Sequence, residues 1–236
     1  MTTTNPSHNP DPDGIEQMFA AVAPRYDLLN TLLSLGRHRH WRTVAASLAS
    51  PAPGSVAIDV CTGTGDLARE LGARVGAEGM VLGLDFCSEM VQVAAMKNRS
   101  ESVRYVVADA HRLPCPTGLA DCAMIAFGIR NVQDPQRVLA EMVRILKVGG
   151  RLVCLEFGLP RDPVRRGLVR GYERTVIPLL GGAFGRRDAY RYLSSSIAAF
   201  AGPEELRTMM SRAGLERIET RTMSLGSVYA HLGVKR

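Results

Sequence analysis

Short apolar runs alternate with helix-like segments along most of this chain, and that alternation restricts its fold more than any other feature. The predicted strands are 56–60, 80–85, 103–108, 121–127 and 151–157, and the predicted helices between them are 66–75, 88–99 and 135–146, with a glycine turn at 147–150. Apolar runs of this length are typical of strands buried on both faces of a sheet. Repeated strand–helix–strand units predict an α/β fold with one mostly parallel sheet.

Further helices and a last pair of strands flank this alternating region. Residues 15–50 are predicted to be helical, with breaks at Pro24 and Gly36. An arginine-rich helical segment follows from 160 to about 201, and then a helix at 203–213. The final strands, 215–223 and 228–234, predict an antiparallel hairpin at the edge of the sheet.

The length of 236 residues suits one domain, because single cores stop growing at about 250–300 residues. We predict that this domain covers 15–236 and that 1–14, which is rich in Thr, Asn, Pro and Asp, is a disordered tail. Within the domain we expect 15–50 to form a lid. We expect 158–202 to form a helical insertion that faces substrate and membrane.

Composition excludes several classes of protein. Apolar residues make up 46% of the chain and charged residues 22%, as in soluble globular proteins. A signal sequence and a long apolar run are both missing from the sequence, so we expect a cytoplasmic protein. The five cysteines form no C-x-x-C pair, and neither a disulfide framework nor a metal site is predicted. The net charge of +6 favours an anionic partner or surface.

A glycine turn, Gly63-Thr64-Gly65, lies between the first predicted strand and its helix. Glycines in such a turn let the backbone approach a ligand closely. Three acidic residues surround the turn or end the neighbouring strands. Asp59 precedes it, Asp85 could accept hydrogen bonds from a ribose diol with Phe86 beside it, and Asp109-Ala110 could hold an adenine amino group. The pattern predicts a nucleoside ligand.

The same residues also fit the dinucleotide pattern G-x-G-x-x-A, through Gly63, Gly65 and Ala68. A sulfonium ligand has no pyrophosphate and is better served by acidic surroundings, which this loop supplies. A nicotinamide-dependent oxidoreductase should carry a Tyr-x-x-x-Lys or similar pair, and Tyr192 is instead followed four positions on by Ser196. The simpler interpretation of the aspartates is that they cap helices and end strands.

Three polar clusters could face a substrate or a partner. Arg130 and Asn131 follow the fourth strand, where they either meet the substrate or form a salt bridge and a turn. Tyr26 and His38 lie among basic and aromatic residues of the leading helices, without a recognised nucleic-acid module, so nucleic acid is not expected. Arginines at 161, 165, 166, 170 and 174 alternate with apolar residues, a pattern typical of a solvated helix face or of docking on anionic lipid.

These clusters, in this order, resemble the ubiquinone/menaquinone biosynthesis C-methyltransferase family over nearly the whole chain after the tail. The matching motifs are Arg25 to Asn30, Gly36 to Arg42, Gly63 to Leu67, Phe127 to Val132, Leu155 to Phe157 and Tyr190 to Leu193. The resemblance implies a Rossmann-like class I methyltransferase with a seven-stranded, mostly parallel sheet. It also implies S-adenosylmethionine as cofactor.

Site residues and substrate follow from the same resemblance. Positions matching Thr64, Asp85, Asp109 and Ala110 are the usual cofactor contacts, and a serine often counted among them is Ala126 here. The substrate implied is a polyprenylated hydroquinone, either demethylmenaquinol or a methoxy-polyprenyl-benzoquinol. Ser194 to Ser196 and Tyr229-Ala230-His231 depart from the family pattern and leave the choice of quinol open.

The expected mechanism is attack by an aromatic carbon on the sulfonium methyl group, after the ring loses a hydroxyl proton. Arg130 would stabilise the oxyanion and Asn131 would orient the hydroxyl, while Tyr26 or His38 would relay or accept the proton. The rival interpretations are a methyltransferase of the same fold for another phenolic or lipid metabolite, an NAD(P)-dependent oxidoreductase, and a non-catalytic binding protein. Expected partners are the quinol, the inner face of a membrane as a peripheral contact, and a second copy of the chain.

Overall fold

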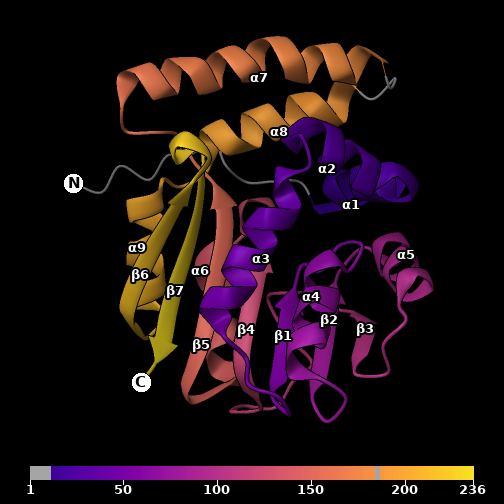
Figure 1. Ribbon diagram of the computed structural model, residues 1–236, viewed down its shortest axis with the longest axis vertical. Helices are drawn as coiled ribbons and strands as arrows, with labels where there is room; N and C mark the ends of the chain where they lie inside the picture. The colour runs from indigo at the N-terminus through magenta and orange to yellow at the C-terminus, as the bar shows by residue number, and fades with distance from the viewer. Residues whose placement is uncertain (1–11, 184–186) are drawn as a thin grey trace.

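The computed structural model describes residues 12–183 and 187–236 and centres on one seven-stranded sheet, shown in Figure 1. The strands are β1 Val56–Val60, β2 Met80–Asp85, β3 Val103–Val107, β4 Ala120–Ala126, β5 Leu146–Phe157, β6 Leu215–Met223 and β7 Val228–Lys235. They lie in the order β3-β2-β1-β4-β5-β7-β6. The first five are parallel, and β7 is antiparallel to both β5 and β6. The predicted α/β sheet with an antiparallel C-terminal pair is confirmed.

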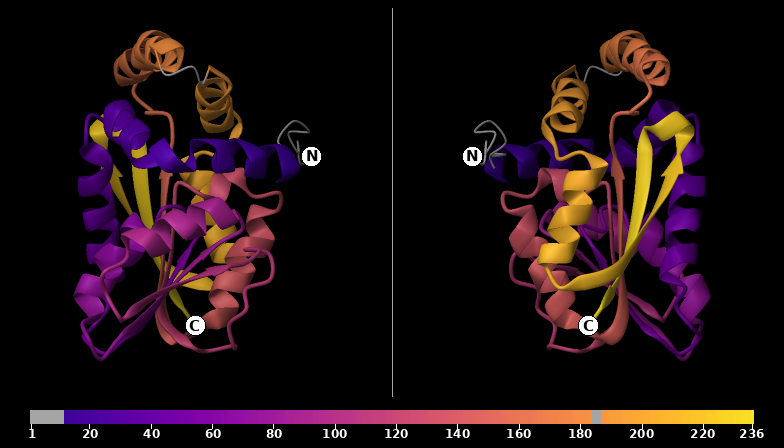
Figure 2. Two further views of the ribbon diagram at one scale, coloured as in Figure 1. Left: turned by 90° about the vertical axis from the view of Figure 1, so that its right-hand side faces the viewer. Right: turned by 90° about the vertical axis from the view of Figure 1, so that its left-hand side faces the viewer.

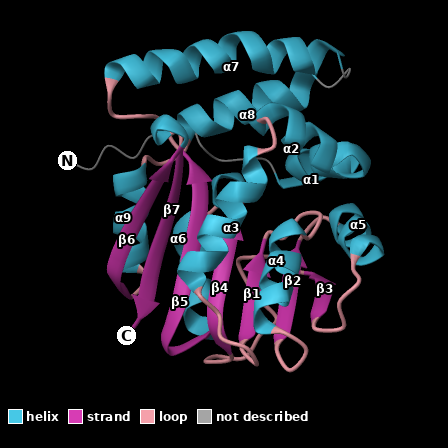
Figure 3. Cartoon of the chain, in the orientation of Figure 1, coloured by secondary structure: helices cyan, strands magenta, loops and turns pink. Residues whose placement is uncertain are grey.

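Helices cover both faces of the sheet and the carboxyl ends of its parallel strands. They are α1 Pro12–Val22, α2 Tyr26–Ser34, α3 Arg37–Ala49, α4 Asp66–Val75, α5 Ser88–Lys97, α6 Pro135–Ile145, α7 Pro163–Ala183, α8 Arg187–Ala199 and α9 Pro203–Arg212, with short 3₁₀ turns η1 Ala23–Arg25, η2 Ile129–Asn131 and η3 Ser224–Gly226. Helices α3 and α4 pack on one face, and α6 and α9 pack on the other (Figure 2). Helices α1, α2, α7 and α8 gather beyond the carboxyl ends of the parallel strands (Figure 3).

Two buried clusters follow from the alternation of side chains along the central strands. In β1, Ile58 and Val60 pack on the side of α6 and α9, while Ala57 packs on the side of α3 and α4. In β4, Ile125 packs on the side of α6 and α9, and Met124 packs on the side of α3 and α4. Successive side chains of a strand point to opposite faces, so runs that are apolar throughout bury both faces.

Helix α6 shows how the sequence sets an element's start and its buried face. The side chain of Asp134 accepts a hydrogen bond from the Arg137 backbone N–H, and Pro135 occupies the first turn. Both features are typical of helix starts. The buried positions are spaced by three and four residues and are Val138, Leu139, Met142, Val143 and Ile145.

The prediction that residues 147–150 form a turn between a helix and the next strand is wrong, because β5 already begins at Leu146. The pairing with β4 jumps from Ala120 opposite Leu146 to Cys122 opposite Arg151, so β5 contains extra residues there. Gly149 has a φ of +76° within this irregularity. A glycine in the left-handed region lets a bulge form without ending the strand.

The ends of the helical regions differ slightly from expectation. Helix α1 begins at Pro12, so the predicted tail falls mainly on residues 1–11, which lie outside the described residues. The breaks expected at Pro24 and Gly36 separate α1, α2 and α3 as predicted. Within the described ranges, no helix has the length and apolarity needed to cross a membrane.

Candidate active site

A cavity of about 490 Å³ lies at the carboxyl ends of β1, β2 and β3. We call it the acidic cavity, because Glu16, Asp85 and Asp109 line it. Its walls also include Cys61, Phe86, Ala110 and, from beyond β4, Asn131. Ligands of open parallel sheets bind at this edge, where the order of the strands reverses. In this sheet the reversal falls between β1 and β4.

The rim of the sheet is held in an unusual backbone conformation. Cys61, after β1, and Phe127, after β4, have φ angles of 55° and 58°, a region that side chains other than glycine seldom occupy. Strain of this kind gathers at functional sites. Gly128 brings the two loops together, because a Cβ there would lie 2.5 Å from the Cβ of Cys61.

Asp85 organises the floor of the acidic cavity. Its two carboxylate oxygens accept hydrogen bonds from the backbone N–H groups of Gly63, at 2.8 Å, and Cys87, at 3.0 Å. Burial raises its pKa, and the backbone hydrogen bonds oppose that shift. Each oxygen of a carboxylate has two lone pairs, so both can still accept a hydrogen bond from a ribose hydroxyl.

Asp109 and Ala110 form the opposite wall, after β3. The Asp109 carboxylate accepts a hydrogen bond from the backbone N–H of His111 at 2.9 Å, and 67% of its side chain is exposed. One carboxylate oxygen is therefore available to a ligand. Three carboxylates line this cavity, and no lysine or arginine stands among its described lining residues. This donor set fits a cationic sulfonium nucleoside better than a pyrophosphate.

Five of the predicted cofactor residues lie at the end of β1, in the glycine turn or at the end of β4 without lining the acidic cavity. Asp59 is buried and accepts the hydroxyl hydrogen bond of Thr62 at 2.6 Å, and burial raises its pKa to about 7. The Thr64 hydroxyl donates to Asp27 of α2. Gly65 makes room for the Tyr105 ring, and Ala126 packs into the cluster on the α3 side. Gly63 leaves open space beside Tyr26, whose ring would be 3.8 Å from a Cβ at that position.

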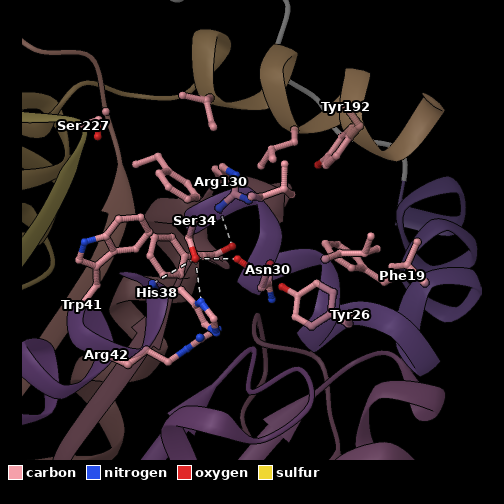
Figure 4. Close-up of a pocket in the computed structure, with 18 of the residues that line it drawn as sticks. Phe19, Tyr26, Asn30, Ser34, His38, Trp41, Arg42, Arg130, Tyr192 and Ser227 are labelled. Atoms are coloured by element: carbon pink, nitrogen blue, oxygen red, sulfur yellow. Dashed lines mark hydrogen bonds between the residues drawn. The ribbon is translucent and has the colours of Figure 1, made fainter. Parts of the chain in front are cut away.

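A second cavity, of about 200 Å³, lies between α1, α2 and α3, the rim of the sheet, and α7 and α8 (Figure 4). We call it the apolar cavity. Most of its lining is aliphatic or aromatic, including Phe19, Leu29, Trp41, Phe127, Phe157 and Ile197. Its polar lining residues include Tyr26, Asn30, Ser34, His38, Arg130 and Tyr192. An apolar pocket with a few polar groups is typical of a site for a mainly hydrophobic ligand.

Arg130 is fixed in the wall of the apolar cavity by a buried carboxylate. Its Nη1 donates to Glu156 Oε1 at 2.8 Å and to the Phe127 carbonyl at 2.6 Å. The guanidinium also lies 5.4 Å from the centre of the Phe157 ring. Burial raises the pKa of Glu156, while the charge of Arg130 opposes that shift. Arg130 thus forms the salt bridge that the sequence analysis gave as one of two alternatives, and it also lines the apolar cavity.

Asn131 connects the two cavities. It lines the acidic cavity, and its Oδ1 accepts a hydrogen bond at 3.0 Å from the hydroxyl of Tyr192, which lines the apolar cavity. Its amide nitrogen lies 3.4 Å from the Phe127 carbonyl, a weak hydrogen bond. A single residue therefore has one side toward each compartment.

Tyr26, Asn30 and Ser34 extend along one face of α2 at four-residue spacing and all line the apolar cavity. His38 continues this face into α3, with its Nδ1 2.7 Å from Ser34 Oγ. Burial and the nearby charge of Arg42 lower the pKa of His38. The predicted residues Tyr26, His38 and Arg130 thus come together at one cavity.

The sequence interpretation assigned no site role to Ser34, Trp41, Glu156 or Tyr192, although the last three lie in motifs that carry the family resemblance. The four-residue spacing from Tyr26 to Ser34 was a usable signal for Ser34, because such positions share a helix face. Glu156 gave a weaker signal as a carboxylate in an apolar strand. The side chains of Arg174, Tyr190 and Arg191 lie outside the described residues.

Solved structures share this architecture. The fold matches a SAM-dependent methyltransferase of Thermotoga maritima with a TM-score of 0.67 and 21% identity, over 93% of this chain and 99% of that one. It matches a SAM-dependent methyltransferase of Aquifex aeolicus with a TM-score of 0.61 and 17% identity, over 96% and 99% of the two chains. These two likenesses show that the chain has the fold of S-adenosylmethionine-dependent methyltransferases.

The sequence comparisons define the class further. The profile of the ubiE/COQ5 methyltransferase family matches residues 7–235, and the chain belongs to that family. It is 44% identical over 220 residues to the demethylmenaquinone methyltransferase of Thermus thermophilus, covering 92% of this chain and 99% of the relative. It is 39% identical over 225 residues to the ubiquinone/menaquinone biosynthesis C-methyltransferase UbiE of Geobacter sp. (strain M21), covering 94% and 96%. These matches exclude the oxidoreductase interpretation.

Proposed function

We propose that this enzyme transfers the methyl group of S-adenosylmethionine to a ring carbon of a polyprenylated hydroquinone, with demethylmenaquinol as the first candidate. The observation that carries the proposal is the junction of an acidic cavity and an apolar cavity through Asn131 and Tyr192. The names of the two relatives support quinol rings as substrates and favour demethylmenaquinol.

The cofactor would occupy the acidic cavity. Asp85 would accept the ribose hydroxyls with Phe86 beside it, and Asp109 with Ala110 would hold the adenine ring. Gly63, Thr64 and Gly65 would give the loop its shape, and Asp59 would fix the loop from below. The cofactor supplies a methyl group made electrophilic by a sulfonium. Because α1 contributes to both cavities and α2 contributes to the apolar cavity, we further propose that 15–50 acts as a lid.

The apolar cavity would hold the ring and activate it. The guanidinium of Arg130 would stabilise the phenolate formed when the hydroxyl loses its proton. Asn131 would orient that hydroxyl between the compartments, and Tyr26 would keep the ring near the glycine loop. His38, in the same wall, would accept the proton. Holding the two reactants at near-attack distance would supply a large share of the rate enhancement.

The test is anaerobic incubation of the full chain with methyl-labelled S-adenosylmethionine and, in parallel, reduced demethylmenaquinone and a reduced methoxy-polyprenyl-benzoquinone. Label on a ring carbon of either product supports the proposal and names the quinol. Cofactor binding by calorimetry without label in either product would overturn it in favour of another phenolic or lipid substrate.

We also propose that α7, within 158–202, brings the enzyme onto an anionic membrane surface. Val164 and Leu168 are 72% and 62% exposed, next to the exposed Arg161, Arg165 and Arg170. Apolar and basic side chains on one helix are typical of docking on anionic lipid.

The double variant Val164→Asp/Leu168→Asp should lose sedimentation with phosphatidylglycerol vesicles. The control Val148→Asp, at an exposed site on β5, should keep it. Equal binding of both variants would contradict the proposal.

A further inference from the structure

Methylation of a ring carbon leaves a proton to be removed from the apolar cavity. The transfer forms a carbon–carbon bond and breaks the sulfur–methyl bond, with its electron pair remaining on sulfur. A cation thus becomes a neutral thioether, while the ring loses its hydroxyl proton and later returns its ring hydrogen to the oxygen. One proton per turnover must therefore reach water, and apolar walls do not conduct it.

His38 lies where the apolar cavity meets a third cavity. This polar cavity, of about 400 Å³, is lined mainly by charged groups of α2, α3 and α4, including Asp27, Arg39, Arg42, Asp66 and Arg69. His38 and Arg42 line both cavities. Only 4% of His38 is exposed, and its ring lies between Ser34 and Arg42 in Figure 4. Imidazole is thus placed between the proposed ring site and a polar compartment.

The hydrogen bonds of Ser34 determine which nitrogen of His38 carries the proton. Ser34 Oγ donates its single hydrogen to the Asn30 carbonyl at 2.6 Å. It accepts from the backbone N–H of His38 at 3.2 Å and lies 2.7 Å from Nδ1. A hydroxyl has one hydrogen and two lone pairs, so Nδ1 must be the donor in that contact. In the neutral ring Nε2 therefore holds a lone pair and can accept a proton.

The charges that face His38 suit release into the polar cavity. Arg39 and Arg42 of α3 lower its pKa, as burial does, while Asp66 of α4 and Asp27 of α2 oppose that shift. The ring is therefore neutral before the reaction. Asp66 lies 3.6 Å from Arg42 Nη1 and also pairs with Arg69 and Lys97. Burial raises its pKa, but the charges of these three residues outweigh burial and lower it, so an ionised carboxylate stands on the far side of the boundary.

We propose that His38 is the proton outlet of the apolar cavity: it takes the hydroxyl proton at Nε2, directly or through one water, and passes it to the polar cavity beside Asp66. Ser34 is a positioning residue that sets the tautomer. This inference rests on the proposed function and adds the route by which the proton leaves.

Kinetics of the full chain with the quinol that wild type methylates test the outlet. His38→Gln should lower kcat about 100-fold or more while calorimetry shows unchanged cofactor binding, and His40→Gln, at an exposed site on the same helix, should match wild type. The wild-type loss of kcat at low pH should disappear in His38→Gln, and added imidazole should restore His38→Ala. A kcat within threefold of wild type, or an unchanged pH profile, would overturn the outlet. Failure of wild type on every quinol would instead contradict the proposed function.

Histidine ¹⁵N chemical shifts test the tautomer without turnover. In wild type the His38 signals should report a protonated Nδ1 and an unprotonated Nε2, assigned by their loss in His38→Gln. Ser34→Ala should weaken that preference, and Ser34→Thr, which keeps the hydroxyl, should retain it. A protonated Nε2 in wild type would overturn the proposed route.

Discussion

The hydroxyl of Thr64, in the glycine loop, donates a hydrogen bond to the carboxylate of Asp27, in α2. Lys97 of α5 and Asp27 form an ion pair at the same point. A helix that lines the apolar cavity is thereby attached to the loop beside the acidic cavity, and motion of one must affect the other.

Thr64→Val keeps the shape of the side chain and removes this hydrogen bond. We expect the free energy of unfolding to fall by about 1 kcal/mol, because Asp27 keeps its ion pair with Lys97. Amide hydrogen exchange should become faster in α2. Urea unfolding and exchange mass spectrometry measure both effects. Thr208→Val, at an exposed site in α9, is the control. Equal results for the two variants would show that the Thr64–Asp27 hydrogen bond does not couple α2 to the glycine loop.

Asp85→Asn should weaken binding of S-adenosylmethionine about 10- to 100-fold. An amide has one acceptor oxygen and no charge, so it cannot serve the Gly63 and Cys87 N–H groups and the ribose together, and hydrogen bonds to charged groups contribute about 1.5–3 kcal/mol. Calorimetry gives the dissociation constant. Asp162→Asn, at an exposed site before α7, should bind like wild type. Unchanged affinity in Asp85→Asn would place the cofactor elsewhere.

Glu156→Gln should destabilise the protein by about 3–5 kcal/mol, because it leaves the buried charge of Arg130 without its carboxylate. The double variant Arg130→Met/Glu156→Leu should be more stable than either single variant, since it removes both buried charges. Chemical unfolding of wild type, Arg130→Met, Glu156→Leu and the double variant forms a double-mutant cycle. Additive losses would mean that the pair is not coupled.

His231 should make the protein less stable in mild acid. Burial lowers its pKa to about 4, below the unfolded value of 6.5. Between these two values the unfolded chain binds a proton that the folded chain does not, so stability is complete above about pH 6.5 and falls as the pH drops toward 4. The loss is about 3 kcal/mol when the shift is fully expressed. His231→Gln should remove this part of the slope in urea unfolding between pH 7 and 4. The same slope in wild type and variant would contradict the assignment.

Gly128→Ala should destabilise the rim, because its Cβ would overlap that of Cys61. Overpacking of this kind costs about 1–3 kcal/mol. Gly167→Ala in α7, where a Cβ meets nothing within 4 Å, should be neutral or stabilising. Thermal unfolding of the two variants compares them directly. A Gly128→Ala protein as stable as wild type would show that the two loops separate easily.

Much of the sheet could be predicted because each strand is a short apolar run between turn signals, as at Val56–Val60. The bulge in β5 could not be predicted, because glycines after a helix favour a turn. The strand continues through them because Leu146 pairs with Ala120 before the bulge and Arg151 pairs with Cys122 after it. Site residues at strand ends, such as Asp85, follow from topology. Tyr192 and Glu156 reach the site only through tertiary packing, which brings distant segments of the chain to one cavity. The local sequence pattern does not indicate which distant segments meet.

The position of β7 in the sheet determines the order in which the last two strands pair. It follows β6 in the chain but lies between β6 and β5, so β6 has no partner on the sheet until β7 has paired. On the ribosome, α9 and β6 would emerge and wait beside an open β5 edge. Ser227, just before β7, also lines the apolar cavity. The nascent enzyme therefore completes its apolar cavity and covers the open edge of β5 in the same late step.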